Sequence, residues 1–320
     1  MMISPTAIHL DACSICQLEC PLCVTAEGVS IIGRGYLAFE SFRRLIDRNP
    51  WIREVDFASK GEMFLNKELV QILQYAHGKN ISLDIGHGVN LNHAGEEALE
   101  ALVKYQVIGL RVSIDGITQK TYQRYRVGGN LKRVIENIQK INRYKAKYHA
   151  AKPHLIFQFI PFGYNDHEME GARLLARMLN MEICFHLNRV PGFFPVQDRD
   201  MVRRYVGHAD RGEYLTGKGK GYMRHKCYQM WTKPHIGWDG KLFGCSTNIW
   251  GVYADTVFDE NLVSCINNEK MQYARDMLMG SKPPRTDIPC LKCFIYQDIL
   301  EYSNWITEGE VFSAVQAVKE

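Results

Sequence analysis

The sequence predicts an α/β protein with three parts: a partial parallel barrel in residues 1–190, a connector in residues 191–226 and a small cysteine-rich domain in residues 227–320. Three observations support this organisation. Short apolar runs alternate with stretches of helical period over the first part. Gly- and Pro-rich segments replace this pattern in the connector. Seven of the ten cysteines fall into compact groups, and four of those seven lie in the last part.

The barrel is predicted from six strands that alternate with five helices. The predicted strands are Thr6–Ala12, Val55–Ala58, Ile81–Ile85, Gly109–Ile114, Leu155–Ile160 and Glu182–Leu187. The predicted helices are Ser41–Asp47, Glu68–His77, Glu96–Tyr105, Leu131–Tyr148 and Glu168–Leu179. Alternation of this kind indicates parallel strands, right-handed crossovers and helices on the outside. Because six units are too few to close an eight-stranded barrel, we expect an open or partial (β/α)6 barrel.

The connector contains one predicted helix, near Arg199–Tyr205. The glycine-rich stretch Gly217–Gly221 lacks the GK[ST] ending of a phosphate-binding loop, so we expect a flexible connector there. In the last part, short strands, turns and cysteines predict a small domain held together by metal.

Composition excludes several classes of protein. Hydrophobic residues make up 46% and charged residues 23%, the balance of an ordinary globular protein, which excludes a disordered or a collagenous chain. The net charge of +4 gives little support to a nucleic-acid partner. The apolar runs are too short to span a bilayer, and the first residues lack the features of a signal peptide, so we expect a cytoplasmic protein without a membrane partner. Clustered cysteines in such a chain indicate metal or redox chemistry.

The first cysteine group follows the first predicted strand and has the spacing C-x3-C-x2-C, formed by Cys16, Cys20 and Cys23. Three thiolates within eight residues can hold three irons of a [4Fe–4S] cluster and leave the fourth iron open for another ligand. The alternatives are structural cysteines and a zinc site, which usually has four closed ligands. The spacing and position resemble those of the radical SAM superfamily, whose members bind S-adenosylmethionine (SAM) at the open iron.

The resemblance extends to the ends of the later strands. Residues 60–63 resemble the superfamily's GGEP loop, which binds the SAM amino group, although only Gly61 and Glu62 match it. Ser113 and Arg126 lie in segments that resemble those contacting the SAM carboxylate and ribose. Asn165 matches a position that often helps to hold the adenosine. The resemblance therefore implies these five residues as the SAM site.

The second cysteine group resembles the C-terminal extension of SPASM and twitch-type radical SAM enzymes. It comprises Cys227, Cys245, Cys290 and Cys293, with the hairpin turn Asp239-Gly240 just before the second ligand. Because no cysteine follows the fourth one, the resemblance implies the twitch form, in which these thiolates close the coordination of one auxiliary [4Fe–4S] cluster. A zinc ribbon held by the same cysteines is the alternative.

The resemblance also implies a reaction. It predicts SAM and two [4Fe–4S] clusters per chain as cofactors, a 5′-deoxyadenosyl radical that abstracts hydrogen from a C–H bond, and an external one-electron reductant such as flavodoxin or ferredoxin. Polar strand ends favour a small carbohydrate-like substrate (a sugar, aminoglycoside or aminocyclitol), which is epimerised or dehydrogenated.

Two alternatives remain for the function. A maturase or epimerase of a ribosomally made peptide is one, although the first strand begins by Thr6 and we expect no peptide-recognition domain before it. An iron–sulfur or zinc scaffold without enzymatic activity is the other. It is disfavoured because a scaffold has no need of the loops that contain Gly61, Glu62 and Ser113.

Epimerisation requires a group that returns hydrogen to the opposite face of the carbon. In relatives, a second cysteine often follows the auxiliary-cluster ligand, and here that position is Ser246, whose O–H is a far poorer hydrogen donor than a thiol. Cys184 and His186 alternate along the sixth strand, so both can face the lumen, as hydrogen donor and as acid or base. A buried core role is the alternative for each. Further predicted lumen residues are His87, Gln158, Asn188 and Arg189, whereas Cys13 and Cys265 are predicted to be structural.

Overall fold

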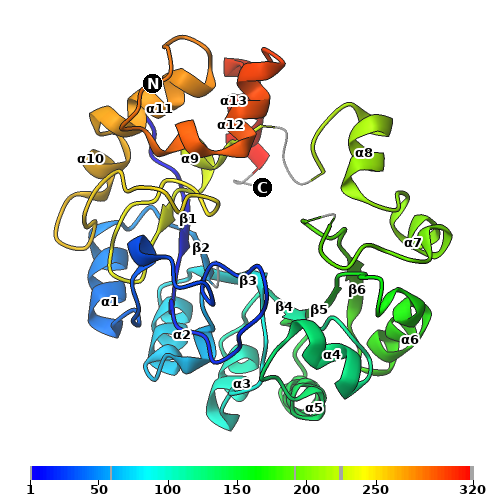
Figure 1. The fold of residues 1–320 in the computed structure, drawn as a ribbon. Coiled ribbons are helices and arrows are strands. Elements are labelled where there is room, and N and C mark those ends of the chain that lie inside the picture. The colour runs from blue at the N-terminus through cyan, green and yellow to red at the C-terminus, as the bar shows by residue number, and fades with distance from the viewer. Residues whose placement is uncertain (1, 58–59, 191, 223–225, 318–320) are drawn as a thin grey trace. The chain divides into compact units, whose positions relative to one another are not determined.

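The computed structural model describes residues 2–57, 60–190, 192–222 and 226–317 (Figure 1). The chain forms two compact units. The first unit contains Met1–Ile15, Gly28–Leu83 and Arg224–Glu320, and the second contains Cys16–Glu27 and Asp84–Met223. Both units are built from parallel strands and helices, and each is described by itself.

The first unit is organised around strand β1 (Ala7–Leu10), all four residues of which are buried. This strand pairs in parallel with β2 (Glu54–Phe57) on one side and with β7 (His235–Ile236) on the other. The helices of this unit are α1 (Phe39–Arg48), α2 (Leu69–Gly78), α9 (Gln229–Thr232), α10 (Leu262–Ile266), α11 (Glu269–Leu278), α12 (Phe294–Glu301) and α13 (Glu308–Ala317). Segments from the two ends of the chain therefore share one sheet.

The second unit has four parallel strands in the order β3 (Ser82–Val89), β4 (Gly109–Ser113), β5 (His154–Phe159) and β6 (Glu182–Phe185). Its helices are α3 (Glu96–Lys104), α4 (Gln119–Tyr125), α5 (Leu131–Lys147), α6 (Met169–Met178), α7 (Arg199–Val206) and α8 (Arg211–Lys218). The described strands do not close into a complete barrel in either unit. The predicted α/β class with an open parallel sheet is confirmed.

Strand register in the second unit separates an apolar face from a polar one. Ser113 pairs with Gln158, which pairs with Cys184, and paired residues of parallel strands point to the same side. Arg111 lies two residues before Ser113 and therefore shares that side, which we call the lumen face. The residues that alternate with them along β4 and β5, such as Val112 and Phe157, are fully buried. They form the apolar face.

Helix α5 illustrates why the helical predictions succeed. Asn130 caps its N-terminus by accepting a hydrogen bond from the Arg133 amide. Its apolar residues recur at helical spacing and are buried: Leu131, Val134, Ile138 and Ile141. The charged residues of the same helix lie on the other side, so one apolar stripe fixes how the helix packs.

All six predicted strands form, and each observed end lies within four residues of the predicted end. Ala58, the predicted end of the second strand, lies outside the described residues. Helices α4 and α8 and strand β7 were not predicted, nor were helices α9 to α13 in residues 227–320, where short strands and turns were expected. Helix α8 ends at Lys218, so part of the stretch expected to be flexible, Gly217–Gly221, is helical.

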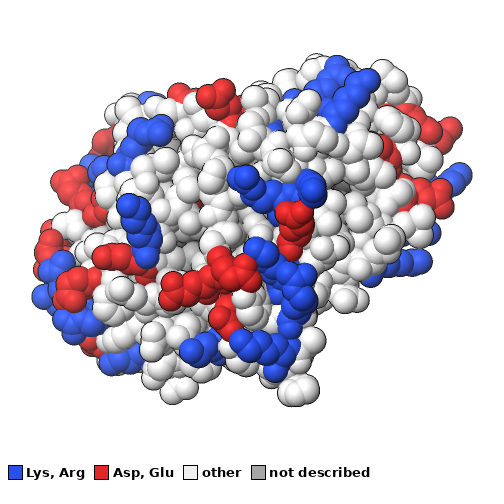
Figure 2. All heavy atoms as spheres, turned by 90° about the horizontal axis from the view of Figure 1, so that it is seen from below, with Lys and Arg blue, Asp and Glu red and all other residues white. Residues whose placement is uncertain are grey.

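Acidic and basic side chains are interspersed on the face drawn in Figure 2. Exposed charged side chains form local ion pairs, such as that of Arg43 with Glu40 one turn away on α1, and pairs of this kind contribute little to stability. Among the helices of the described residues, none combines the length and apolar character needed to cross a bilayer.

Asn66 fixes the loop after β2 from inside the first unit. Its buried side-chain amide donates hydrogen bonds to the carbonyl oxygens of Ala12 (2.8 Å) and Leu37 (2.9 Å). Its oxygen accepts one from the Glu68 amide. The segment after β1 and the segment before α1 are thereby joined through one side chain.

We predict that Asn66→Ala destabilises the protein by about 2–4 kcal/mol, because two buried carbonyl oxygens lose their donor. The measurement is the apparent melting temperature of the anaerobically purified protein at one scan rate, which should fall by several degrees. Asn304→Ala, at an exposed position, is the control and should leave it unchanged. Equal melting temperatures for the two variants would contradict this assignment.

Candidate active site

The first cysteine group lies on a loop of the second unit, and neighbouring residues direct its sulfurs. The sulfur of Cys16 accepts hydrogen bonds from the Leu18 amide (3.4 Å) and from the side chain of Asn90 (3.6 Å). The Glu19 amide donates to the carbonyl oxygen of Val127, which joins this loop to the segment after α4. The structure thus brings the segment that contains Arg126 against the cysteine loop.

Arg126 connects this loop to the end of β4. Its guanidinium forms an ion pair with Asp115, with Nε–Oδ2 and Nη2–Oδ2 distances of 2.6 and 2.5 Å, and its Nη1 points to the sulfur of Cys20 at 3.7 Å. Asp115 is completely buried. Burial raises the pKa of the Asp115 carboxyl, and the charge of Arg126 opposes that rise. Burial likewise raises the pKa of Cys20, with Arg126 again opposing it.

Asn165 holds the strand ends together. It is fully buried, its amide donates to the carbonyl oxygens of Asp115 (2.9 Å) and Ile160 (3.1 Å), and its oxygen accepts from the Phe162 amide (2.6 Å). Every polar atom of this side chain therefore has a backbone partner. Its contribution to a ligand site is to fix the loops around it.

Ser113 lies at the end of β4 on the lumen face. A side chain at Gly88 would meet its hydroxyl, since a Cβ there would come within 2.6 Å of Ser113 Oγ. Gly88 also has a φ of +101°, a conformation that favours glycine. The predicted SAM residues Ser113, Arg126 and Asn165 therefore belong to the same unit as Cys16, Cys20 and Cys23.

In the first unit, Gly61 and Glu62 form a tight loop after β2. Gly61 has a φ of +64°, and a Cβ there would lie 2.4 Å from the carbonyl oxygen of Cys13. Only glycine fits this position. The buried carboxylate of Glu62 accepts from the Phe64 amide, and its own amide donates to Ile15 O at 2.8 Å. The loop is locked against the end of β1.

Lys60 links that loop to the segment after Cys245. Its amide donates to Asp11 Oδ1 (3.0 Å), and its buried ammonium donates to the carbonyl oxygen of Ser246 (2.8 Å). The other oxygen of Asp11 pairs with His235, and both of these side chains are fully buried. Lys60 stands where the GGEP pattern has its first glycine. It thus connects the predicted SAM-binding loop with the segment after Cys245, and all of these residues belong to the first unit.

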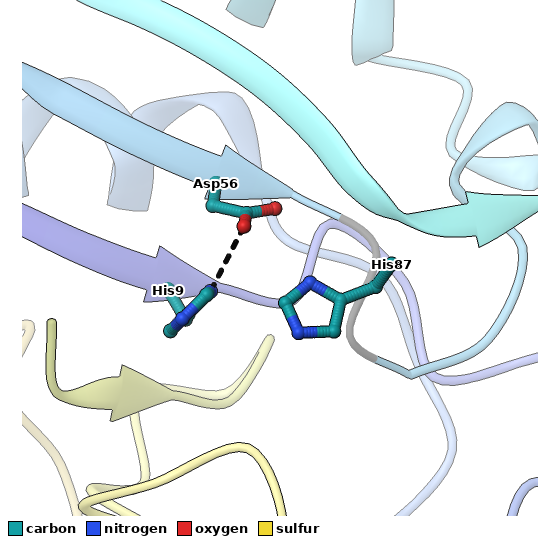
Figure 3. A group of neighbouring side chains, drawn as sticks. All are labelled: His9, Asp56 and His87. Carbon is teal, nitrogen blue, oxygen red and sulfur yellow. Dashed lines mark ion pairs between the residues drawn. The ribbon is translucent and has the colours of Figure 1, made fainter. Parts of the chain in front are cut away.

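The hydroxyl of Ser246 is part of a buried polar chain. Both its amide and its hydroxyl donate to Gln229 Oε1 at 3.0 Å, and the Gln229 amide lies 2.7 Å from His9 Nε2. Since an amide nitrogen only donates, His9 Nε2 accepts and Nδ1 carries the proton that faces Asp56 at 3.3 Å (Figure 3). The Ser246 hydroxyl is therefore a hydrogen-bond donor in this series of buried polar side chains.

The second cysteine group is assembled around one apolar cavity of the first unit. All four predicted ligands line it, Cys227, Cys245, Cys290 and Cys293, and all are buried. Hydrogen bonds from Cys227 and from two backbone amides lower the pKa of Cys245 to about 6, against the effect of burial. The hydroxyl of Tyr253 lies 3.2 Å from the sulfur of Cys290.

Four buried cysteines around one cavity form a donor set that suits either a tetrahedral zinc ion or an iron–sulfur cluster.

The remaining cysteines include one on the lumen face. Cys184 is half-buried, and its sulfur lies 3.4 Å from His186 Nε2. Arg111 Nη1 lies 2.9 Å from the same nitrogen, which must accept because a guanidinium only donates. Cys13 and Cys265 are buried and contact the Ile15 carbonyl oxygen and the Glu260 carboxylate.

His186 is a neutral base in this environment. Burial, together with the positive charges of Arg111 and Arg211, lowers its pKa from 6.5 to about 4. At neutral pH it therefore accepts hydrogen bonds and carries no charge.

Arg111 and Lys60 were missed as functional candidates. Arg111 lies within a predicted strand, and its alternation with Ser113 was a signal that both face the same side. Lys60 was noted only as a departure from the GGEP pattern. Its partner, the Ser246 carbonyl oxygen, is 186 residues away, which no local pattern reveals.

A sequence model of the radical SAM superfamily matches residues 12–176. No curated protein matches the chain. The matched segment contains the first cysteine group and the five predicted SAM residues.

Solved structures show the same fold. The structure of SuiB from Streptococcus suis bound to S-adenosylmethionine has a TM-score of 0.64 and 14% identity, and the match covers 92% of this chain and 71% of that chain. The structure of SuiB bound to precursor peptide SuiA has a TM-score of 0.64 and 13% identity, and the match covers 92% of this chain and 70% of that chain. The structure of BtrN in an open conformation has a TM-score of 0.50 and 12% identity, and the match covers 92% of this chain and 94% of that chain. The likeness in fold thus continues beyond residue 176.

We predict that His186 makes the protein acid-sensitive. A histidine whose pKa is lowered by folding stabilises the folded state fully above pH 6.5, and this contribution is lost as the pH falls towards 4. The free energy of unfolding should therefore fall between pH 7.5 and pH 5.5, and His186→Gln should make this fall smaller by about 1 kcal/mol, a value that allows for the partial exposure of His186. The measurement is the apparent melting temperature at the two pH values.

His154→Gln is the matched control, since His154 is exposed and pairs with Glu182 at the surface. It should leave the difference between the two pH values almost unchanged. If both variants show the wild-type difference, His186 is not the group responsible.

Proposed function

Because the chain belongs to the radical SAM superfamily and shares the fold of its SPASM/twitch-type members, we propose that it abstracts hydrogen from a C–H bond of a carbohydrate-like small molecule. When bound, SAM and the reduced first cluster supply a 5′-deoxyadenosyl radical, and the auxiliary cluster supplies a site that exchanges electrons. The proposal depends above all on the polar lumen face of the second unit, because this face carries side chains that suit a hydroxylated substrate.

The residues proposed to hold SAM are Gly61, Glu62, Ser113, Arg126 and Asn165. Glu62 offers a buried carboxylate for the SAM ammonium group, in a loop that Gly61 makes possible. Ser113 offers a hydroxyl on the lumen face. Arg126 positions the cluster loop through Cys20 and is the proposed counter-charge for the SAM carboxylate. Asn165 acts through the loops that it braces.

Two sets of thiolates hold the clusters in this proposal. Cys16, Cys20 and Cys23 hold the SAM cluster, and the four cysteines of the second group hold the auxiliary one. The buried hydroxyl of Tyr253 donates to Cys290 once that sulfur is a thiolate, since a metal-bound thiolate only accepts. An external one-electron reductant, such as flavodoxin or ferredoxin, supplies electrons to the protein.

The substrate class is inferred from the lumen face. Arg111, Ser113, Gln158, Cys184 and His186 all offer hydrogen-bonding groups where apolar side chains would otherwise pack. Such a surface favours a molecule with several hydroxyl groups over an apolar one. A peptide substrate is the second candidate, because SuiB, which shares the fold, was solved with a precursor peptide bound.

Epimerisation is the first proposed outcome, and Cys184 supports it. After hydrogen abstraction, the Cys184 thiol gives a hydrogen atom to the opposite face of the substrate carbon, which forms a C–H bond and leaves a sulfur radical. One electron from the external reductant and one proton restore the thiol. The Cys184 sulfur lies 3.4 Å from Nε2 of neutral His186, and this nitrogen carries no proton because it accepts from Arg111.

Dehydrogenation is the second proposed outcome, and the auxiliary cysteine cavity supports it. Here the substrate radical loses one electron and its hydroxyl proton to become a carbonyl compound. A cluster held by Cys227, Cys245, Cys290 and Cys293 would supply an acceptor for that electron.

Metal content tests the cofactors. After anaerobic reconstitution we expect about eight irons per chain, falling to about four when Cys16, Cys20 and Cys23 are all changed to Ala. The same fall should follow when Cys227, Cys245, Cys290 and Cys293 are changed. The measurement is iron, sulfide and zinc per chain. Four irons together with one zinc in the wild type would exclude the auxiliary cluster and, with it, the proposed route for dehydrogenation.

Isotope transfer tests the substrate class and the role of Cys184. Deuterium should move from C–H-labelled sugars or aminocyclitols, and not from labelled peptides, into 5′-deoxyadenosine. In D2O the wild-type enzyme should add deuterium to the epimerised product, and Cys184→Ala should lower product formation at least 100-fold while 5′-deoxyadenosine still forms. Cys265→Ala, which removes another buried cysteine, is the control. Unchanged product from Cys184→Ala would rule out the thiol as donor.

A further inference from the structure

Three arginines lie near the carboxyl end of β6 in the second unit. Arg111 on β4 contacts His186 through Nη1, at 2.9 Å. Arg211, the first residue of α8, donates from Nε and Nη2 to the carbonyl oxygen of Leu187 at 3.2 and 3.0 Å. Arg189 is exposed in the loop that follows β6. The sequence therefore gathers positive charge at one end of the lumen face.

The contacts of these arginines leave their charges uncompensated. No carboxylate of the described residues pairs with Arg111, Arg189 or Arg211. The Nε atom of Arg111 is buried, with no hydrogen-bond partner in the part of the chain that the structure describes. The Arg211 guanidinium lies over the ring of Tyr222, 5.1 Å from its centre.

The acidic residues on β6 and at α8 have other partners. Glu182 on β6 pairs with His154 at 2.7 Å, and Asp210 before α8 pairs with Arg199 at 2.6 Å. Glu213 on α8 is held by Arg199 and by Arg203, the latter at 2.9 Å. The positive charge is therefore not balanced from within these elements.

The surroundings show that the charges act on one another. Burial lowers the pKa of Arg211, and the nearby Arg189 lowers it further, although Tyr222 opposes both. Arg111 and Arg211 together lower the pKa of His186. Half-buried cations that repel one another destabilise a fold unless an anion joins them.

We propose that Arg111, Arg189 and Arg211 form an oxyanion-binding subsite, and that the substrate carries a phosphate or carboxylate group that binds there. This inference rests on the proposed function, because it places the substrate on the lumen face beside Cys184. Arginine suits the task because its planar guanidinium offers paired N–H donors to the two oxygens of a phosphate or carboxylate. Neutral His186 adds no charge and receives the Arg111 hydrogen bond, which directs that guanidinium.

Anion binding tests the proposal without turnover. The full-length, cluster-loaded protein is titrated calorimetrically with pyrophosphate or with glutarate, in the presence of saturating SAM and at constant ionic strength set with sodium chloride. We expect saturable binding of one of the two probes. Stronger binding of pyrophosphate identifies a phosphate-bearing substrate, and stronger binding of glutarate identifies a carboxylate-bearing one.

Matched variants locate the site. Arg111→Gln should weaken binding of the preferred probe at least tenfold, whereas Arg204→Gln, an equal change of charge at an exposed position of α7, should not change it. Arg189→Gln removes an exposed side chain and tests the subsite even if Arg111→Gln fails to fold; it should also weaken binding. Equal affinity of Arg189→Gln and Arg204→Gln, or the lack of saturable binding by both probes, would overturn the proposal.

Iron content and SAM cleavage are measured on the same wild-type preparation, which separates this inference from the proposed function. A protein with its clusters and SAM cleavage intact that binds neither probe overturns only the oxyanion subsite. A protein without the expected iron overturns the proposed function, whichever probe it binds.

Discussion

The buried contact between Asp115 and Arg126 is the interaction on which most of the second unit's site depends. Asp115 follows β4, accepts a hydrogen bond from the Ile160 amide after β5, and has its carbonyl oxygen bound by Asn165. Arg126 reaches from this carboxylate to the sulfur of Cys20. A charge this deeply buried is tolerated because its partner is fixed beside it. The strand ends and the cysteine loop are therefore positioned by one carboxylate.

In the first unit, the loop after β2 is held in place by backbone contacts and by one lysine. Gly61 allows the loop after β2 to approach the backbone at Cys13 so closely that no side chain fits between them. Lys60 then extends from that loop to the carbonyl oxygen of Ser246, next to Cys245. A departure from the GGEP pattern thus connects the loop proposed to hold SAM with the residue that follows Cys245, one of the proposed auxiliary ligands. A glycine at this position has no side chain to make this connection.

Sequence predicted the repeating parts well and the long-range contacts poorly. Buried strands such as Leu155–Ile160 and long amphipathic helices such as Leu131–Tyr148 are visible because their apolar residues recur with a fixed period. Strand β7 has two residues and is stabilised by pairing with β1, more than 200 residues away. Cysteine spacing identified the candidate ligands. The full set of backbone partners of Asn165 and the uncompensated charge of Arg111 depend on which distant groups surround them, which a single sequence does not reveal.

The two candidate hydrogen donors differ in chemistry as well as in place. The Ser246 hydroxyl donates to Gln229, in a chain that continues to His9 and Asp56, and an O–H bond is too strong to give its hydrogen atom readily to a carbon radical. Cys184 has the weaker S–H bond. Its neighbour His186 already accepts from Arg111 at Nε2, so this nitrogen has no proton to donate to the sulfur. On these grounds the lumen face favours return of hydrogen by Cys184 over any role of Ser246 as a donor.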